Sequence, residues 1–206
     1  MLAYTPLHLL LLEPSIDFPK ALVMTSGNMS EEPIAFEDRD ALQRLSGIAD
    51  CFLTNDREIQ TRIDDSVFRV FQGKDYPIRR SRGYAPEPIR VQDSLPELQA
   101  CGAELKNTFA LSREKYLFLS HHIGDLENYE TLKAYEQEVA YYRKIFRIQP
   151  TAVAVDLHPD YLSTKFGLKL AEMESLPILQ IQHHHAHLRA CLVDNDFPSS
   201  EPVIGL

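Results

Sequence analysis

An apolar stripe in the second half of the chain predicts its strongest helix. Its members recur at intervals of three and four residues, the spacing that keeps side chains on one face of a helix. They are Leu132, Tyr135, Val139, Tyr142 and Phe146. Asn128 is a suitable N-cap, and Pro150 lies just beyond the last turn. A shorter helix is expected at residues 38–45.

Short apolar runs elsewhere have the length and composition of β-strands. Residues 21–24, 152–155 and 178–181 are typical of buried strands. Residues 67–71 alternate as a half-buried strand does, and residues 72–75 have the composition of a turn after it.

Two further apolar runs predict a hairpin. Residues 109–112 and 116–119 flank the charged triplet 113–115, which we expect to be its turn. Helices are expected after Ser163, as an N-cap, and through the histidine-rich segment that follows residue 182. The resulting order of strand, hairpin, helix, strand, helix, strand and helix predicts an α/β layer. In such layers the active groups lie at the carboxyl ends of the strands.

Prolines divide the pattern into two blocks. Residues 85–96 hold three of the chain's 13 prolines and interrupt regular structure. We therefore expect a domain at residues 1–88, a linker at 89–97 and a second domain at 98–206. Apolar residues open and close the chain, which favours a piece of a longer protein.

Composition narrows the classes of function. The formal net charge of -9 argues against a general nucleic-acid binder, because phosphate contacts need a basic surface. No apolar run approaches the roughly 20 residues of a membrane span. The three cysteines are far apart and form no C-x-x-C pair, which favours reduced thiols in the cytoplasm.

Four of the eight histidines fall within five positions and give the best local clue to chemistry. If the segment is helical, His183 and His187 stand at i and i+4, so both imidazoles point the same way and can offer two nitrogens to one metal ion. His184 and His185 are expected to have supporting roles. Two ligands do not complete a metal site.

Basic, acidic and glycine-containing motifs are open to two interpretations each. Three arginines at residues 79–82 suit an anion site or a solvated basic turn. Asp64 and Asp65, between Arg62 and Ser66, suit magnesium beside a phosphate or an acidic turn. The loops 25–28 and 102–108 suit phosphate cradles or ordinary turns.

Polar groups also follow two predicted strands, at residues 120–125 and 156–164. A pair such as Asp156 and His158 is usually structural, with the imidazole hydrogen-bonded locally. Cys191 is more often a small core residue than a ligand.

Taken together and in order, these motifs resemble those of the HypF family of carbamoyltransferases, which act in NiFe-hydrogenase maturation. The matching strings are TSGNMS at 25–30, EPI at 32–34, RIDDSV at 62–67, residues 79–86, GAELKNTF at 102–109, HIGDLEN at 122–128, residues 156–164 and QHHHAH at 182–187. The resemblance covers essentially the whole chain.

The resemblance implies an α/β fold in two parts: the C-terminal portion of a YrdC-like domain, then the RNase H-like (ASKHA) first lobe of a TsaD-like domain. The YrdC-like domain would use Mg-ATP to adenylate carbamate derived from carbamoyl phosphate. The TsaD-like domain would pass the carbamoyl group to the C-terminal cysteine of the partner HypE. The resulting thiocarbamate would supply the cyanide ligands of the hydrogenase iron.

The resemblance also implies roles for individual residues. Contacts to ATP or phosphate would come from Ser26, Asn28, Arg62, Ser66, Arg80 and Arg82, with Lys106 and Asn107 near the adenylate. His183 and His187 would bind iron or zinc, which acts as a Lewis acid.

Several features depart from the family pattern. Asn55, Asp56 and Arg57 stand where His-Asn-Arg is usual, and His121 stands where Gln is usual. The family's acylphosphatase domain, its zinc fingers and the lobe that supplies an aspartate metal ligand are not in this sequence. We therefore expect the 206 residues alone to have little or no activity. The alternatives are an O-carbamoyltransferase of small molecules and a non-catalytic docking module.

Overall fold

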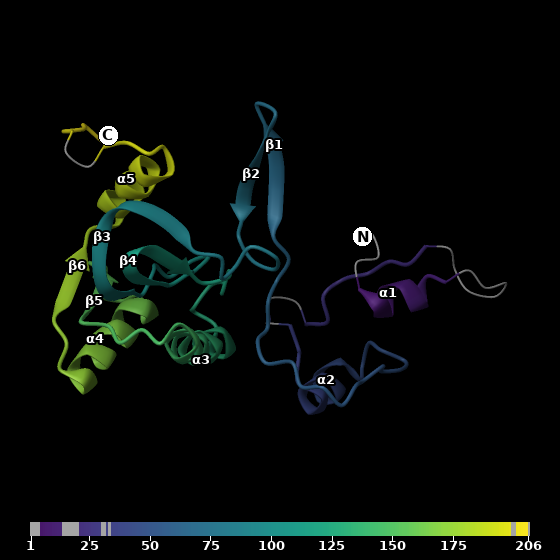
Figure 1. Ribbon diagram of the computed structural model, residues 1–206. Helices are drawn as coiled ribbons and strands as arrows, with labels where there is room; N and C mark the ends of the chain where they lie inside the picture. Colours follow the sequence, from purple (N-terminus) through teal and green to yellow (C-terminus); the bar gives the residue numbers. More distant parts are fainter. Residues whose placement is uncertain (1–4, 14–20, 30–31, 33, 199–200, 206) are drawn as a thin grey trace. The chain divides into compact units, whose positions relative to one another are not determined.

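The computed structural model describes residues 5–13, 21–29, 32, 34–198 and 201–205 (Figure 1). They belong to two compact units, Met1–Ile59 and Gln60–Leu206. Among the described residues, no helix is long and apolar enough to cross a membrane.

The first unit contains helices α1 (Pro6–Leu11) and α2 (Asp38–Leu45). The helix expected at residues 38–45 is confirmed. Arg44 in its last turn forms ion pairs with Asp40, 2.7 Å away, and with Glu32, 2.8 Å away.

The strand expected at residues 21–24 is wrong, because these residues are in irregular structure. The side chain of Val23 is 100% exposed. An apolar run becomes a strand only where another strand pairs with it, and no described residue pairs with this one.

The second unit begins with an antiparallel hairpin of β1 (Val67–Phe71) and β2 (Lys74–Arg79). Strand β1 has the predicted bounds. The turn is shorter than expected, since Lys74 and Asp75 already pair in β2. Gln72 and Gly73 form the turn with φ values of 51° and 74°, the left-handed backbone that a two-residue hairpin turn requires.

The main sheet of this unit has four strands in the order β4-β3-β5-β6 (Figure 1). They are β3 (Ile89–Ala100), β4 (Ala110–Leu119), β5 (Ala152–Asp156) and β6 (Ile178–Ile181). Strand β4 runs antiparallel to β3, whereas β5 and β6 continue the sheet in parallel. An α/β arrangement is therefore confirmed.

Two local predictions in this sheet are corrected. Residues 89–97, expected as a linker, are the first part of strand β3. The predicted hairpin at residues 109–119 is instead one strand, β4, paired with β3. Glu114, expected in the turn, has a φ of 52° and lies at a shift in register opposite Leu95. The charged triplet is therefore a β-bulge. The division into domains at residues 1–88 and 98–206 stays a prediction.

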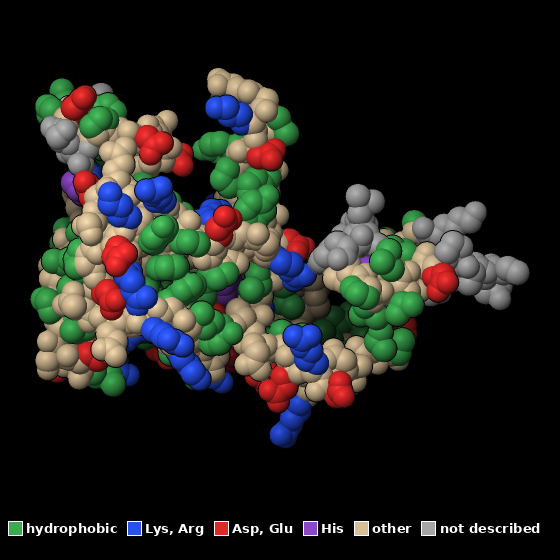
Figure 2. All heavy atoms as spheres, in the orientation of Figure 1, with side chains coloured by type: hydrophobic (Ala, Val, Ile, Leu, Met, Phe, Trp, Pro, Cys, Tyr) green, Lys and Arg blue, Asp and Glu red, His purple; other side chains and the backbone are tan. Residues whose placement is uncertain are grey.

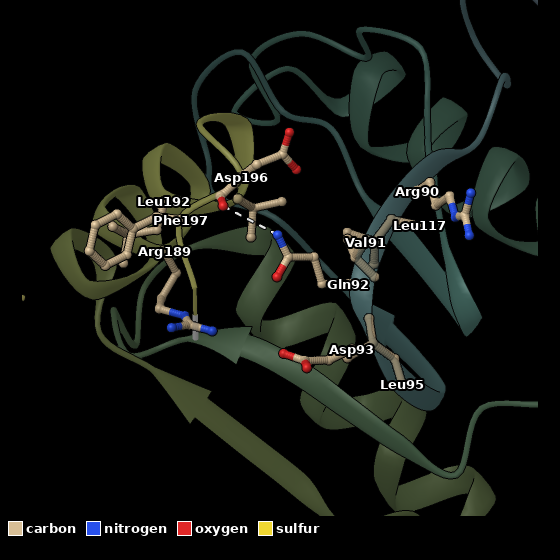
Figure 3. Close-up of a pocket in the computed structure, with 11 residues that line it drawn as sticks. Arg90, Val91, Gln92, Asp93, Leu95, Leu117, Arg189, Leu192, Asp196 and Phe197 are labelled. Atoms are coloured by element: carbon tan, nitrogen blue, oxygen red, sulfur yellow. Dashed lines mark hydrogen bonds between the residues drawn. The ribbon is translucent and has the colours of Figure 1, made fainter. Parts of the chain in front are cut away.

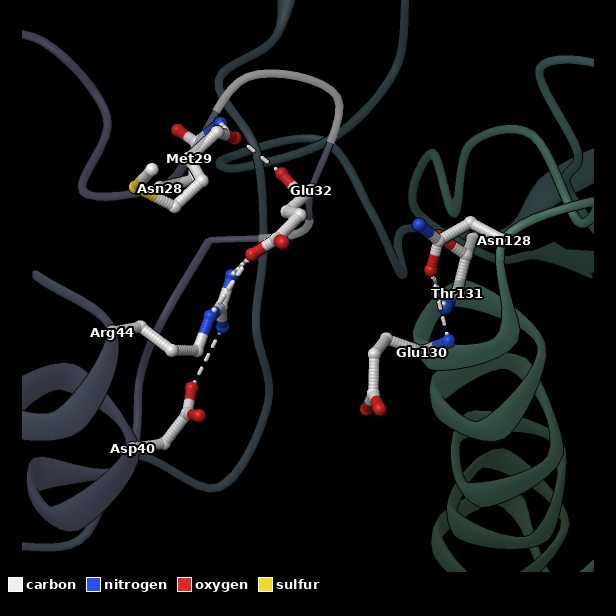
Figure 4. A network of polar contacts seen from close by, with 8 residues as sticks. All are labelled: Asn28, Met29, Glu32, Asp40, Arg44, Asn128, Glu130 and Thr131. Atoms are coloured by element: carbon white, nitrogen blue, oxygen red, sulfur yellow. Dashed lines mark hydrogen bonds and ion pairs between the residues drawn. The ribbon is translucent and has the colours of Figure 1, made fainter.

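Three helices complete the unit: α3 (Tyr129–Phe146), α4 (Leu162–Glu174) and α5 (His183–Asp194). Asn128 caps α3 as predicted, because its Oδ1 accepts hydrogen bonds from the backbone of Glu130 and Thr131 (Figure 4). Ser163 is not an N-cap. It is buried in the first turn of α4, where the carboxylate of Glu104 accepts the Leu162 N–H at 2.6 Å. The predicted order of elements otherwise holds.

The core lies between the sheet and helices α3 and α4. Phe109 and Leu111 of the sheet region pack with Tyr135 and Tyr142 of α3, all in one buried cluster. Val153 and Val155 of β5 pack toward Phe166 and Leu170 of α4. Ala154, which points to the other face of the sheet, borders a cavity with α5. Helices α4 and α5 therefore cover opposite faces of the sheet at its carboxyl edge.

Candidate functional site

A cavity of about 320 Å³ lies where the carboxyl ends of β3, β5 and β6 meet helix α5. Small residues form most of its wall: Ala100, Gly102, Ala103, Ala154, Ala186 and Ala190. Ala100 and Ala154 are direct partners in the parallel pairing of β3 and β5. Asp156, His183 and His187 supply the polar groups of the wall, at the edge where α/β layers bind ligands.

The two histidines converge as the spacing predicts. In helix α5, Nε2 of His187 lies 3.1 Å from Nε2 of His183. The rings stand 4.8 Å apart, with a 74° angle between their planes. Without a metal ion, this distance fits a hydrogen bond in which one ring donates a proton to the other.

Asp156 orients the first histidine from the end of β5. Its Oδ2 lies 2.7 Å from Nδ1 of His183, and its side chain is only 10% exposed. The Thr164 hydroxyl in α4 donates to the backbone carbonyl of Asp156 and holds that end of the strand. A proton on Nδ1 leaves Nε2 of His183 with a free lone pair, the usual arrangement of a histidine that binds metal.

This pair fits two of the ligands of a metal ion. Two metal–nitrogen bonds of about 2.0–2.1 Å, at an angle between 90° and the tetrahedral value, place their nitrogens about 2.8–3.4 Å apart. The observed 3.1 Å lies within that range. Within the described part of the chain, no group of three or more His, Cys, Asp or Glu side chains is placed to hold a metal ion. Further ligands would have to come from a substrate, water or another chain segment.

The loop that contains Lys106 and Asn107 shapes the cavity through its backbone. Asn107 is 1% exposed, and its Nδ2 donates to the carbonyls of Cys101 and Ala103. The backbone N–H of Lys106 donates to Oδ1 of Asp125 at 2.6 Å. The loop contributes Gly102 and Ala103 to the wall, but the side chains of Lys106 and Asn107 are not part of it.

The predicted phosphate-binding residues of the hairpin region lie together in the second unit. The Ser66 hydroxyl donates to the carbonyl of Arg82 and accepts the backbone N–H of Ser81. Nη2 of Arg82 donates to the carbonyl of Ile63, 3.0 Å away. Arg80 donates to the carbonyl of Glu87, 3.1 Å away. The side chains of Ser66, Arg80 and Arg82 are therefore hydrogen-bonded to backbone groups between residues 63 and 87.

Basic side chains of both sequence blocks lie near the loop after β4. Burial lowers the pKa of His122, and the positive charges of Arg79 and Lys106 lower it further. The negative charges of Asp64 and Asp125 raise this pKa and offset part of the decrease. Burial also lowers the pKa of His121 to about 4, and Arg62 adds to the effect. An anion near these histidines would relieve part of this positive field.

Ser26 and Asn28 belong to the first unit. Asn28 is half-buried and its Nδ2 donates to the carbonyls of Met29 and Glu32 (Figure 4). The carbonyl of Ser26 accepts the N–H of Asn28, and the side chain of Ser26 is exposed. Asn28 therefore stabilises its own loop.

A second cavity, of about 140 Å³, lies between β3 and the end of α5 (Figure 3). Val91 and Leu95 line one side, and Leu192 and Phe197 line the other. Gln92 spans it and donates to the carbonyl of Asp196 at 3.2 Å. Its lining lacks the converging imidazoles of the first cavity.

Sequence reasoning found the histidine pair but missed the residues that make it a site. The local sequence places Asp156 at the end of a strand and favours a structural pair with His158, but gives no sign that Asp156 is the partner of His183. The spacing within one helix signals the pair, whereas Asp156 lies 27 residues away and only the topology brings it close. The alanines of the cavity wall come from separate elements and form no motif in the sequence.

Comparison with known proteins gives consistent matches along the whole chain. A family model described as the HypF Kae1-like domain matches residues 93–194, and a Sua5/YciO/YrdC model, described as telomere recombination, matches residues 1–81. Carbamoyltransferase HypF2 of Cupriavidus necator is 43% identical over 221 residues, covering 100% of this chain and 27% of that protein. Carbamoyltransferase HypF of Rhizobium leguminosarum bv. viciae is 43% identical over 210 residues, with the same coverage. The chain thus spans about a quarter of the length of these relatives.

Solved structures agree with these matches. A crystal structure of full-length HypF in a phosphate- and nucleotide-bound form matches with a TM-score of 0.87 and 46% identity, covering 100% of this chain and 31% of that one. The crystal structure of HypF from T. kodakarensis matches with a TM-score of 0.78 and 36% identity, covering 84% of this chain and 23% of that one.

Proposed function

The chain belongs to the HypF family, whose curated relatives are named carbamoyltransferases, and we propose that its cavity at the His183–His187 pair serves ATP-dependent carbamoyl transfer. The reaction would use carbamoyl phosphate and Mg-ATP in the cytoplasm, as part of NiFe-hydrogenase maturation. The acceptor would be the C-terminal cysteine of HypE.

The observation that carries the proposal is the convergence of two imidazoles beside a small-residue wall. Nε2 of His183 and Nε2 of His187 lie 3.1 Å apart, and Asp156 fixes the tautomer of the first. Two nitrogens at this separation suit an iron or zinc ion. The alanine and glycine wall leaves room for a ligand without competing side chains.

The proposed reaction has two stages. Carbamate, released from carbamoyl phosphate, attacks the α-phosphorus of ATP through its oxygen, and pyrophosphate leaves with the electrons of the broken P–O bond. The thiolate of HypE then attacks the carbamoyl carbon, a C–S bond forms, and the bond to the AMP oxygen breaks. The products are the thiocarbamate and AMP.

The residues of this chain would bind and orient the carbamoyl-adenylate. Asp156 would keep the Nδ1 proton of His183, so that both Nε2 atoms face the ligand. His183 and His187 would hold a metal ion, which would supply Lewis-acid chemistry toward a phosphate or carbamoyl oxygen. Ala100, Ala154 and Ala186 would leave the space that the ligand fills.

The adenylating stage would involve the predicted phosphate-binding residues. Arg62, Arg80 and Arg82 carry fixed charges suited to phosphate oxygens. Ser66 already donates its only hydroxyl proton to the carbonyl of Arg82, so it would contact phosphate only after that bond is exchanged. Ser26 and Asn28 would contribute from the first unit.

Metal binding tests the proposal directly. We expect His183→Ala and His187→Ala to weaken the affinity of the chain for Zn²⁺ at least tenfold, since each removes one of two nitrogen donors. Asp156→Asn should weaken it about 10–100-fold, because the amide does not hold the Nδ1 proton as a carboxylate does. Competition with a chromogenic chelator would measure these affinities.

His185→Ala is the matched control, because His185 is exposed on the same helix and has no part in the pair. It should retain Zn²⁺ affinity within about twofold. Absence of Zn²⁺ binding by the unsubstituted chain, or equal losses in the His185 variant, would favour a docking module.

Catalysis by the chain alone is a separate question. We expect little or no ATP–pyrophosphate exchange dependent on carbamoyl phosphate, because the chain covers about a quarter of its relatives. Robust exchange by the 206 residues would contradict this. Transfer to HypE, or to a small-molecule hydroxyl instead, would distinguish the two enzymatic alternatives in a longer protein.

A further inference from the structure

His158 is held beside the histidine pair by contacts that do not involve the pair's Nε2 atoms. Its backbone N–H donates to Oδ1 of Asp156 at 2.9 Å, and Oδ2 of the same carboxylate holds His183 at 2.7 Å. One largely buried carboxylate, 10% exposed, therefore sets the positions of both residues. Pro159, the next residue, further restricts the backbone.

The ring of His158 is also fixed. It stacks on Tyr161, with centroids 4.2 Å apart and planes within 13°. The Tyr161 ring in turn packs edge-on against His183, with centroids 6.4 Å apart. These contacts form a row of rings from His158 to His187 at the end of the cavity.

The backbone selects one neutral tautomer of His158. Nδ1 accepts the N–H of Asp160 at 3.3 Å and therefore carries no proton in the neutral ring. The proton must be on Nε2. The residue is exposed, and no described group is hydrogen-bonded to this Nε2. A pre-oriented N–H donor thus stands free next to the candidate site.

We propose that His158 donates this hydrogen bond to an anionic phosphate oxygen of the nucleotide that binds at the His183–His187 pair. The inference rests on the proposed function, since that function places a nucleotide in the cavity. His158 does not line the cavity wall itself, so it would contact the part of the ligand that extends past Asp156. Stacking and the bond from Asp160 already restrict the ring, and little rotational freedom is left to lose on binding.

The test separates the N–H donor from the ring. His158→Phe retains a ring that can stack on Tyr161 but has no donor, whereas His158→Gln retains an N–H. Binding of ADP in the presence of Zn²⁺, and of Zn²⁺ alone, would be followed by NMR titration of the full 206-residue chain. Two-bond ¹H–¹⁵N spectra of the imidazoles would report the tautomer of His158.

We expect His158→Phe to weaken ADP binding about tenfold, as loss of a hydrogen bond to a charged group does, while Zn²⁺ affinity changes less than twofold. His158→Gln should recover part of the loss, and His185→Phe on helix α5 should bind ADP as the unsubstituted chain does. The neutral ring should carry its proton on Nε2.

Three results would overturn the inference. They are unchanged ADP affinity in His158→Phe, a parallel loss of Zn²⁺ affinity, and a proton on Nδ1. If the unsubstituted chain binds Zn²⁺ and ADP but His158→Phe does so equally well, only the inference fails. If the unsubstituted chain binds neither, the proposed function fails and the inference with it.

Discussion

Replacing Gly102 by alanine should destabilise the second unit by about 3 kcal/mol. Gly102 has a φ of +74°, and a Cβ there would lie 2.2 Å from the carbonyl oxygen of Thr108 and 2.8 Å from Nδ2 of Asn107. The carbonyl is backbone and cannot rotate away. The Asn107 amide that crosses the loop would also have to move, although it is buried and donates to the carbonyls of Cys101 and Ala103.

Gly73→Ala is the matched control for this substitution. Gly73 has the same φ of +74°, but a Cβ there would meet nothing within 4 Å. Its replacement should cost only the left-handed backbone strain, about 1 kcal/mol. Urea unfolding followed by far-UV circular dichroism would give both values. Equal losses in the two variants would show that the contact with Thr108 has no energetic effect.

The Gly102 variant should also affect the candidate site. Gly102 and Ala103 form part of the cavity wall, so a displaced loop narrows the space beside His183. Weaker nucleotide binding with unchanged Zn²⁺ affinity is the expected pattern, because the histidine pair lies on α5 and is oriented from β5.

The sequence predicts those elements whose patterns are local. Helix α3 follows from its apolar stripe and its N-cap. Residues 152–155 and 178–181 are strands as their short apolar runs predict, although only β5 is buried and β6 is a mostly exposed edge strand. The histidine pair follows from the i, i+4 spacing within one helix. Each of these inferences uses residues of one continuous segment of the chain.

The failures have a common cause in contacts that are distant along the chain. Residues 89–97 contain Pro96 and were predicted to be a linker, but Pro96 lies at a register shift in β3, where no regular ladder bond is lost. The first turn of α4 is stabilised by Glu104, 58 residues earlier, instead of Ser163. Asp156 becomes part of the site only because β5 ends beside α5.

The second large effect concerns pH and two buried groups near residues 61–64. Burial raises the pKa of the Glu138 carboxyl to about 7, although the nearby Thr61 hydroxyl and the Arg62 charge lower it. Its Oε2 has no hydrogen-bond partner among the described residues. Burial lowers the pKa of His121 to about 4, and its Nδ1 is similarly without a partner in that part of the chain. Both groups are therefore favoured in their neutral forms.

The two groups affect stability in opposite directions. Glu138 has a raised pKa in the folded state, so its contribution is fully present below about pH 4.5 and is lost as pH rises to about 7. His121 has a lowered pKa, so its contribution is present above about pH 6.5 and is lost as pH falls toward 4. Where the windows overlap, between about pH 4.5 and 6.5, the two slopes oppose each other. The summed contribution of these two groups to the stability of the unsubstituted chain should therefore change little with pH in that range.

Substitution should reveal each slope separately. Glu138→Gln mimics the neutral carboxyl and does not titrate. The free energy of unfolding of this variant, relative to the unsubstituted chain, should therefore rise by about 2 kcal/mol from pH 4.5 to 7, after allowance for partial solvent access. His121→Gln, which installs the residue usual in the family, should gain about 2 kcal/mol relative to the unsubstituted chain from pH 6.5 to 4.5. Differences between variants at each pH cancel the titration of all other groups. Urea unfolding across this range would measure them, and a pH-independent difference for Glu138→Gln would mean that its carboxylate is solvated in the folded chain.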